Sequence, residues 1–490
     1  MLTLLFALLI VPLCGAFVCY PLKGRKSDLV PVIFAGLTFI IGIAATIWGY
    51  QQRQELFLSV PWIQWMGTAP ETFFGFLVDP LSSLMLIVIT SMGLLVVVYS
   101  TEYLSPRNKD HAFKKPVGNY YFWLLLFIGS MVGLVISPNL LQLFFFWEMT
   151  TICSWALISY TREEKALFGG FKALIITHFG SLFFLAALGL LFVYTHSFSF
   201  SALDSLEPGM RLNVFILLMV AAWAKAAQIP FITWLPDAME APTPVSAYLH
   251  AAAMVKAGVY LIARAAVSTQ LPYVAGLVMG IMAIATMIVA IILYFIQDDL
   301  KRLLAFSTIG HLAYVLFGVS LGILGSATGF SGGLLHVINH SYGKGLLFLS
   351  VGAIAYATGS RSIKELSGLG RKMPLASAAF IIGLLAVTGV PPFSCFWSKF
   401  MMFTGAFELG GIVGPTMGVL AILESLTAFA WYLFVGHTII FGEVSPKVAL
   451  AAGDPPMAMD GTLIVLMILS LVAPLIGYPF VKFLSVGCFS

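Results

Sequence analysis

The chain has 490 residues, of which 60% are hydrophobic and only 9% are charged, and its mean hydropathy is +1.00. Soluble globular domains carry about 25% charged and about 45–50% apolar residues, so this composition excludes a soluble protein and predicts a chain that lies mostly in lipid. The formal net charge of +4 and the lack of long Lys/Arg runs give no indication of nucleic-acid binding.

The cysteines are scattered and form no CxxC pair: Cys14, Cys19, Cys153, Cys395 and Cys488. This pattern argues against an iron–sulfur, haem or structural zinc site. We therefore expect no cofactor and no metal in this chain. Any redox chemistry that it serves would take place on another subunit.

Runs of about 20 apolar residues, the length that crosses a bilayer as a helix, occur fourteen times. The predicted spans are 2–21, 28–50, 76–100, 119–137, 139–160, 167–195, 212–236, 242–265, 272–296, 301–323, 331–357, 375–404, 415–441 and 460–486. The first span does not resemble a cleaved signal peptide, because its positive charges follow the apolar run instead of preceding it. We predict an all-α polytopic membrane protein with about fourteen transmembrane helices.

Basic residues are distributed unevenly between the two sides of these spans. With the N-terminus outside, the inner connections hold sixteen: Lys23, Arg25, Lys26, Arg107, Lys109, Lys114, Lys115, Arg162, Lys165, Lys301, Arg302, Arg361, Lys364, Arg371, Lys372 and Lys447. The outer side holds four: Arg53, Arg211, Arg264 and Lys482. By the positive-inside rule, we predict a multi-pass protein of the cell (inner) membrane with both termini outside.

Proline interrupts the seventh and twelfth spans at corresponding places. Pro230 follows Lys225 in the seventh span, and Pro391-Pro392 precedes Lys399 in the twelfth. Corresponding broken helices indicate an internal repeat around a central ion site, so we expect two inverted five-helix repeats with helices 7 and 12 broken. The predicted divisions are 1–111 (helices 1–3), 112–266 (helices 4–8), 267–442 (helices 9–13) and 443–490 (helix 14).

Seven charged residues fall within the apolar spans: Glu148, Lys172, Lys225, Lys256, Lys344, Lys399 and Glu424. A charge at the bilayer centre costs about 2.5–3.5 kcal/mol, so seven unpaired charges would cost on the order of 20 kcal/mol. They must be paired, neutralised or hydrated, and they are the candidate functional residues.

The first candidate pair is Glu148 in the fifth span and Lys225 in the seventh. Burial disfavours the charged form of a lysine and a nearby carboxylate restores it, so a lysine whose partner moves away can release a proton. The alternatives are a structural ion pair for Glu148 and snorkelling to the interface for Lys225. The position of Lys225, about a dozen residues into its span, argues against snorkelling.

Histidines accompany lysines in the eighth and eleventh spans. His250 and Lys256, six residues apart, suit a relay step between helices, although their Ala/Gly-rich surroundings are also typical of close helix packing. His336, His340 and Lys344 follow i, i+4 spacing and share one helix face, as a proton wire requires. A metal site and a packing role for the histidines are the alternatives, but no third metal ligand is evident.

Lys399 corresponds to Lys225 in the second half, and we expect it to be the exit group on the outward path. The second-tier candidates are Lys172, His178, His311, Glu424 and Asp79, which lies near the start of the third span. His311 follows the charged stretch 298–302, which is more simply an interfacial anchor.

These residues lie in motifs that resemble a known family. The motifs are Trp147-Glu148-Met-Thr-Thr, the stretch from Lys225-Ala-Ala-Gln-Ile-Pro to Met-Val-Lys256-Ala-Gly, Asp299-Leu-Lys301-Arg-Leu-Leu, His336-Val-Ile-Asn-His340 and Gly-Val-Pro391-Pro392-Phe. They resemble the antiporter-like subunits that respiratory complex I, Mrp cation/proton antiporters and energy-converting membrane-bound hydrogenases share. The resemblance covers most of residues 75–405 and is strongest to the large A-type Mrp subunit.

The resemblance implies roles for the candidates: Glu148 and Lys225 as the pair of the first half-channel, His250 and Lys256 as the connecting relay, His336, His340 and Lys344 as the central axis, and Lys399 as the terminal lysine. It implies a proton-translocating, or sodium-translocating, subunit of a redox-driven pump or of an Mrp-type antiporter. Its partners would be other membrane subunits and, in an oxidoreductase, iron–sulfur or nickel-containing peripheral subunits. A-type subunits continue past the fourteenth helix, so a chain ending at Ser490 favours a short form.

Two further functions fit the sequence: a self-sufficient cation/proton antiporter, and a structural membrane scaffold whose charges hold helices together. Sodium is an alternative ion, because Asp79, Glu148 and Glu424 could supply the oxygen ligands that a hard cation needs. The predominance of lysine and histidine over carboxylates favours protons.

Overall fold

The structure, a computed structural model, describes residues 2–23, 26–52, 55–56, 74–113, 116–451 and 453–489. Among the basic residues that predict the orientation, Arg25, Arg53, Lys114 and Lys115 lie outside the described residues, as does the side chain of Lys26. The side chain of Cys488 also lies outside them.

The described chain is almost entirely helical, as the sequence predicts. The longer helices are α1 (Leu2–Cys19), α2 (Lys26–Gln52), α3 (Pro80–Tyr103), α4 (Gly118–Val135), α5 (Leu140–Ile158), α6 (Glu164–Thr195), α7 (Pro208–Lys225), α9 (Thr243–Ala251), α10 (Met254–Ser268), α11 (Tyr273–Tyr294), α12 (Leu300–Ile323), α13 (Ala327–Thr358), α15 (Pro374–Thr388), α16 (Ser394–Glu408), α17 (Val413–Ile440) and α19 (Met457–Phe489). The short helices are α8 (Trp234–Asp237), α14 (Leu369–Lys372) and α18 (Pro446–Ala449), with 3-10 turns η1 (Ser159–Thr161), η2 (Phe200–Leu203), η3 (Ala238–Glu240) and η4 (Ile363–Glu365). Strands β1 (Glu55–Leu56) and β2 (Phe76–Leu77) pair antiparallel.

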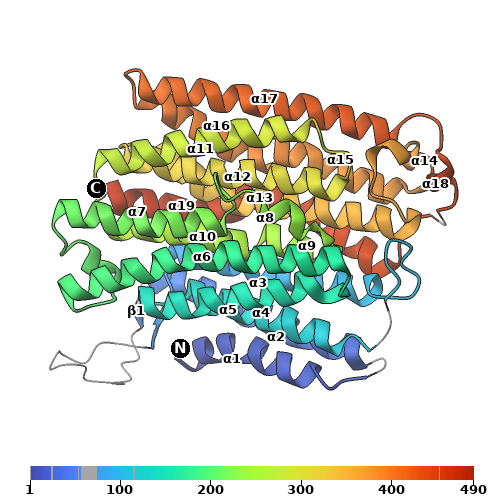
Figure 1. The fold of residues 1–490 in the computed structure, drawn as a ribbon, viewed down its shortest axis with the longest axis horizontal. Helices are drawn as coiled ribbons and strands as arrows, with labels where there is room; N and C mark the ends of the chain where they lie inside the picture. The colour runs from blue at the N-terminus through green and yellow to red at the C-terminus, as the bar shows by residue number, and fades with distance from the viewer. Residues whose placement is uncertain are drawn as a thin grey trace.

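The helices run side by side in one bundle, from α1 and α2 at one edge to α17 at the other (Figure 1). Helix α13 is almost entirely buried and packs against α9, α12, α15, α16 and α19. The last helix, α19, packs against both α3 and α13 and so joins the N-terminal helices to the centre. The interior of the bundle is therefore organised around α13.

Eleven helical segments of the described residues are long and apolar enough to cross a membrane. The other three predicted spans correspond to α7 with α8, to α13, and to α15 with α16. Two of these are interrupted, and α13 carries several polar side chains. The total of fourteen spans, the repeats and the domain divisions stay predictions.

Three helices break inside the bundle. Helix α7 ends at Lys225, and α15 ends at Thr388, each shortly before a proline that lacks the N–H needed to continue a helix. The sequence thus predicts both breaks correctly. It does not predict a third break at Ala252–Ala253, which separates α9 from α10 and lies between His250 and Lys256.

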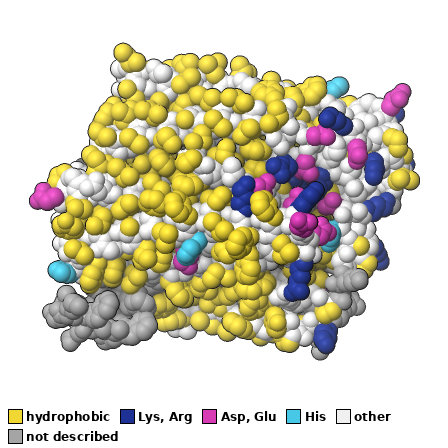
Figure 2. Space-filling view, in the orientation of Figure 1, with side chains coloured by type: hydrophobic (Ala, Val, Ile, Leu, Met, Phe, Trp, Pro, Cys, Tyr) yellow, Lys and Arg dark blue, Asp and Glu magenta, His cyan; other side chains and the backbone are white. Residues whose placement is uncertain are grey.

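Most charged side chains on the face drawn in Figure 2 gather toward one end of the bundle. The loops there correspond to the predicted inner connections. Their ion pairs join separate connections: Arg361 Nε lies 3.4 Å from Asp299 Oδ2 and 3.7 Å from Asp110 Oδ1. Burial disfavours the charge on Arg361, but Asp299 and Asp110 raise the pKa of its guanidinium above the ordinary value.

A buried ion pair joins the start of α3 to α10. Asp79 caps α3 by accepting a hydrogen bond from the Ser82 backbone N–H at 2.8 Å. Arg264 is only 3% exposed, and its guanidinium donates to both carboxylate oxygens of Asp79 and to the Tyr260 hydroxyl. Arg264, counted with the outer side, lies within α10 near its C-terminal end and neutralises Asp79.

Replacing Arg264 by Leu is expected to lower the free energy of unfolding by about 3 kcal/mol, because it leaves the Asp79 carboxylate partly buried without its counter-charge. Thermal unfolding of the purified chain in detergent would measure the loss. The double variant Asp79→Asn/Arg264→Leu should lose less than Arg264→Leu alone. A single variant as stable as the wild type would contradict the stabilising role of this pair.

Candidate functional site

Lys225 lies in the interior at the break of the seventh span. It is the last residue of α7, and its side chain is fully buried. Its Nζ donates to the Trp147 carbonyl at 2.9 Å and to Thr151 Oγ1 at 2.6 Å, and it lies 4.7 Å from the centroid of the Trp147 ring. The partial negative charge at a helix C-terminus also favours a cation there. Lys225 is therefore at a helix end, contrary to the expectation, but it does not reach an interface.

Glu148 directly follows Trp147, whose carbonyl accepts the hydrogen bond from Lys225, but the Glu148 side chain contacts a different helix. Its Oε2 lies 3.0 Å from His178 Nδ1 on α6, and its buried Oε1 has no hydrogen-bond partner among the described residues. In this conformation no ion pair within the described residues joins Glu148 to Lys225, and their pairing stays a prediction. His178, a second-tier candidate, takes that place because α6 packs against α5.

The Glu148–His178 pair lies on an outward-facing part of the bundle. The side chain of His178 is 59% exposed and that of Glu148 is 24% exposed. Figure 2 shows a histidine beside an acidic side chain within a mainly hydrophobic area, where α5 and α6 run. Ionisable groups that face lipid are costly, so the exposed side of this pair needs water or a polar group of another subunit beside it.

Three histidines meet at the centre of the bundle. His311 Nδ1 on α12 lies 3.0 Å from His336 Nε2 on α13, and His336 Nδ1 lies 2.8 Å from Ser398 Oγ on α16. The ring of His340 lies 4.8 Å from that of His311, and neither of its nitrogens has a hydrogen-bond partner in the described chain. His311, a second-tier candidate, is therefore a member of the central group.

These imidazoles are not arranged as a metal site: in the part of the chain that the structure describes, no group of three His, Cys, Asp or Glu side chains could hold an ion. One ring nitrogen of a neutral imidazole donates while the other accepts. The pairwise contacts of His311, His336 and Ser398 therefore form a short hydrogen-bonded chain.

Two further lysines are fully buried beside the histidines. Lys344 Nζ, one turn from His340 on α13, donates to Ser307 Oγ on α12 at 2.7 Å. Lys256 Nζ on α10 donates to the Val337 carbonyl of α13. Neither lysine has a carboxylate partner among the ion pairs of the described residues, and both are held by neutral acceptors.

His250 lies on the other side of the α9–α10 break from Lys256. Its side chain is fully buried, its ring lies 4.8 Å from that of Phe348, and both ring nitrogens lack a hydrogen-bond partner within the described residues. Buried polar atoms are rarely left without a partner. The imidazole of His250 therefore places two unpaired polar atoms inside the bundle, next to the break between α9 and α10. No hydrogen bond within the described residues joins His250 to Lys256.

The surroundings of Lys399 are similar to those of Lys225, with different partners. Lys399 Nζ on α16 donates to Ser425 Oγ at 2.9 Å and lies 4.8 Å from the centroid of the Tyr314 ring. Glu424, buried on α17, accepts a hydrogen bond of 2.6 Å from the Tyr314 hydroxyl. Lys399 thus lies over an aromatic ring, as Lys225 does. Glu424 contacts a residue other than the lysine, as Glu148 does.

Lys172 belongs to the charged end of the bundle. Its Nζ lies 2.6 Å from Asp237 Oδ2, and Arg302 Nη1 lies 3.4 Å from Asp237 Oδ1. A cavity of about 390 Å³ opens at this place, lined by Glu164, Lys165, Phe168, Asp237, Glu240 and Arg302. Lys172 is thus a paired side chain at the rim of the bundle and lies apart from the buried row of lysines and histidines.

Lys301 is a buried lysine that the sequence analysis assigned to a connection. Helix α12 begins one residue earlier, and the Lys301 Nζ donates to the Ala241 carbonyl at 2.6 Å while its side chain is only 1% exposed. The sequence offered one indication that Lys301 is buried: apolar residues flank it, with Leu300 before it and Leu303-Leu304 after it.

The buried cations and imidazoles occupy helices that are neighbours in space. Helices α7 and α10 pack together, as do α10 and α12, α12 and α13, α13 and α16, and α16 and α17. This order carries a row of polar groups through the apolar interior: Lys225, Lys256, His311, His336, His340, Lys344 and Lys399. We call these residues the buried row. Lysine and imidazole can both take up and release protons, so such a row has the chemistry of a proton path.

Comparisons with known proteins identify chains that are related to this one. A family model described as "NADH:quinone oxidoreductase/Mrp antiporter, TM" matches residues 137–425. A second, described as "NADH-Ubiquinone oxidoreductase (complex I), chain 5 N-terminus", matches residues 62–114. The first match contains every member of the buried row.

Among curated proteins, the A-type Na(+)/H(+) antiporter subunit of Alkalihalophilus pseudofirmus is 36% identical over 419 residues, which are 79% of this chain and 50% of that protein. The A1-type Na(+)/H(+) antiporter subunit of Staphylococcus haemolyticus is 34% identical over 472 residues, 91% of this chain and 56% of that protein. The chain spans about half the length of the curated relatives that it matches.

Two solved structures share the fold. A chain of the Mrp complex from Dietzia sp. matches 99% of this chain and 52% of its own length with a TM-score of 0.86 and 29% identity. A chain of the archaeal membrane-bound sulfane sulfur reductase matches 99% of this chain and 96% of its own length with a TM-score of 0.86 and 24% identity. The chain belongs to the family of transmembrane subunits that NADH:quinone oxidoreductases and Mrp antiporters share.

Proposed function

We propose that this chain carries protons through the membrane as one component of a multi-subunit complex. The observation that carries the proposal is the buried row: four lysines and three histidines lie in the interior of an apolar bundle. In the described residues, none of these four lysines has an ion-pair partner. Placing so many ionisable groups in lipid-like surroundings costs stability, and their proton chemistry gives a reason for retaining them.

The first step is a switch of Glu148 between two partners. In this conformation the carboxylate contacts His178, while Lys225 is held by a carbonyl and a hydroxyl. Burial without a counter-charge favours loss of the lysine proton, and a carboxylate turned toward Lys225 favours its retention. Rotation of Glu148 toward His178 therefore drives a proton from Lys225 toward the centre.

The proton then follows the helix order of the buried row. Lys256 passes it toward α13, where imidazoles can accept a proton on one nitrogen and release it from the other. His336 contacts Ser398, and Ser398 directly precedes Lys399 in the chain. Lys399 takes the proton last. Its amine donates a hydrogen bond to Ser425, and the preceding residue, Glu424, serves as the movable carboxylate for Lys399.

Protons fit this arrangement better than sodium. The three carboxylates that the sequence offered as sodium ligands lie apart: Asp79 pairs with Arg264, Glu148 with His178, and Glu424 with Tyr314. A hard cation such as Na⁺ needs several oxygens converging on one point. Transport of sodium by a complex containing this chain would then use other subunits.

We place the charged end of the bundle at the cytoplasmic face of the cell membrane, in keeping with the positive-inside rule. Both termini would then lie outside. The relatives named above as parts of an Mrp complex and of a respiratory membrane complex support other membrane subunits as partners. In an oxidoreductase the partners would include iron–sulfur or nickel-containing peripheral subunits.

Purification of the intact complex and reconstitution into vesicles with an internal pH indicator would test the proposal. Co-purifying iron–sulfur or nickel chains would indicate a redox-driven pump, and small membrane chains alone would indicate an antiporter. The intact complex should move protons, whereas the chain reconstituted alone should not. Cation/proton exchange by the chain alone at the rate of the complex would establish the self-sufficient antiporter instead.

A further inference from the structure

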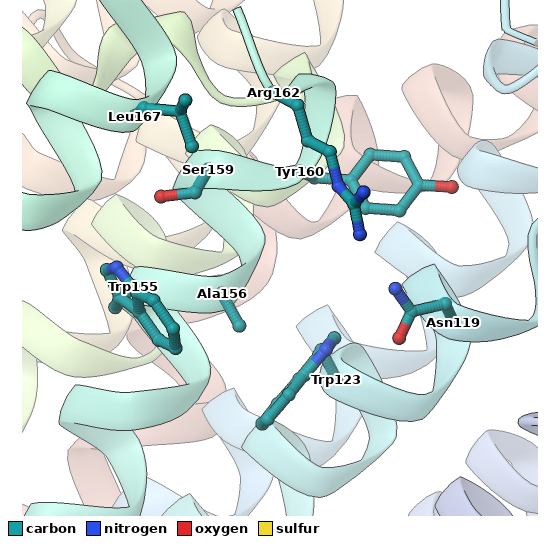
Figure 3. Close-up of a pocket in the computed structure, with 8 residues that line it drawn as sticks. All are labelled: Asn119, Trp123, Trp155, Ala156, Ser159, Tyr160, Arg162 and Leu167. Atoms are coloured by element: carbon teal, nitrogen blue, oxygen red, sulfur yellow. The ribbon is translucent and has the colours of Figure 1, made fainter.

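A cavity of about 270 Å³ opens between α4 and the end of α5, away from the buried row. Its polar and aromatic lining comprises Asn119, Trp123, Trp155, Ser159, Tyr160 and Arg162. Figure 3 shows the Arg162 side chain extending past the Tyr160 ring toward the Asn119 amide, with the indoles of Trp155 and Trp123 on the opposite side of the opening. A cation, an amide and two indoles therefore surround one small space.

Arg162 is available to a ligand in this cavity. Its backbone adopts φ 58°, a left-handed conformation that is uncommon for residues other than glycine, asparagine and aspartate. In the part of the chain that the structure describes, its guanidinium has no ion pair and no hydrogen bond. The adjacent Glu163 does not neutralise it, since Glu163 Oε1 lies 3.3 Å from His111 Nδ1.

The cavity lies at the ends of two membrane-spanning helices, where the interface between membrane and water is expected. It is formed where α4 begins and α5 ends, at the charged end of the bundle, and α5 continues from it into the apolar region (Figure 1). Tryptophan and tyrosine are enriched at membrane interfaces, where their rings sit among lipid headgroups. Basic pockets between transmembrane helices bind the headgroups of anionic lipids.

An exposed apolar stripe leads away from the cavity along α5. Trp155 is 37% exposed, Ile152 47% and Phe145 60%, and their spacing of three and seven residues places them on one helix face. A ligand with its anionic group at Arg162 and hydrocarbon chains along this stripe would contact both. Free phosphate would use the cation alone and leave the indoles and the stripe without a role.

We infer that this cavity binds the headgroup of an anionic phospholipid. The phosphate accepts hydrogen bonds from the Arg162 guanidinium and the Asn119 amide, and the acyl chains lie along Trp155 and Ile152. The guanidinium fork suits two phosphate oxygens at once. A lipid held there fixes the ends of α4 and α5, the helix that carries Glu148.

Titration of the full chain in detergent with phosphatidylglycerol, followed by native mass spectrometry, tests the inference. The informative variant is Arg162→Asn, because asparagine tolerates the left-handed backbone. The matched control is Arg371→Asn, an exposed arginine on α14 that does not line the cavity. Parallel titrations use phosphatidylcholine and inorganic phosphate.

The first phosphatidylglycerol should bind about tenfold more weakly to Arg162→Asn than to the wild type, as expected for the loss of a charge-assisted pair. Arg371→Asn should bind like the wild type, and excess phosphate should not displace the lipid. Equal binding by the two variants would overturn the site, and displacement by phosphate would assign it to a free anion. If Arg162→Asn fails to fold, Trp155→Leu decides: unchanged affinity overturns the inference.

Discussion

Complexes that carry Lys225→Ala are expected to lose proton transport by about 100-fold, the scale of a positioned proton-transfer group. Lys225 is fully buried, and its amine donates two hydrogen bonds to residues of α5, the helix of Glu148. Alanine removes the amine together with its hydrogen bonds to Thr151 Oγ1 and the Trp147 carbonyl. The switch of Glu148 then has no proton to release.

The rate of internal pH change in vesicles measures this effect, with complex content verified by gel filtration. Lys364→Ala is the matched control, since Lys364 is 83% exposed at the charged end and lies 3.7 Å from Asp298. The control should transport protons at the wild-type rate. If Lys225→Ala disrupts assembly while the complexes that do form transport normally, the lysine is structural and the scaffold alternative is favoured.

The second large effect is expected for Lys399→Ala, again a loss of about 100-fold in proton transport. Lys399 is buried on α16 between Tyr314 and Ser425, and the residue before it contacts His336. No other lysine lies on α16. Without it, a proton that reaches the central histidines has no amine through which to leave.

Proton release by reconstituted complexes would show this loss. Trp397→Leu provides the control on the same helix, because Trp397 is 48% exposed and is not a member of the buried row. Wild-type rates in Lys399→Ala would remove this residue from the path. A slowed rate in Trp397→Leu equal to that of Lys399→Ala would indicate damage to α16 instead of loss of the amine.

Most helices can be predicted from the sequence because lipid imposes long apolar runs. The breaks at Pro230 and at Pro391-Pro392 are also predictable, since proline lacks the donor that a helix needs. The break at Ala252–Ala253 is not, because alanine is the best helix former. At this break α9 packs against α13 and α10 packs against α12, and a local pattern does not reveal such contacts between distant helices.

The members of the site are more predictable than their partners. The high cost of a buried charge singles out Lys225, Lys256, Lys344 and Lys399 from the sequence alone. Partner choice depends on which distant helices meet, so neither the contact of Glu148 with His178 nor that of His311 with His336 follows from spacing.

One partner choice was within reach of the sequence. The predicted topology starts the third span and ends the eighth span on the same side of the membrane. A carboxylate inside the membrane needs a counter-charge. Asp79 and Arg264, at those two ends, could therefore have been paired before the structure was known.

The most direct test of a continuous proton path is the rate of proton transport by the intact complex carrying Lys344→Met. Lys344 lies in the middle of the buried row, one turn from His340, and its amine donates a hydrogen bond to Ser307. Methionine keeps an unbranched chain of similar length but cannot carry a proton. A path through α13 predicts an assembled complex with transport reduced by about 100-fold, whereas an assembled complex with the wild-type rate would contradict it.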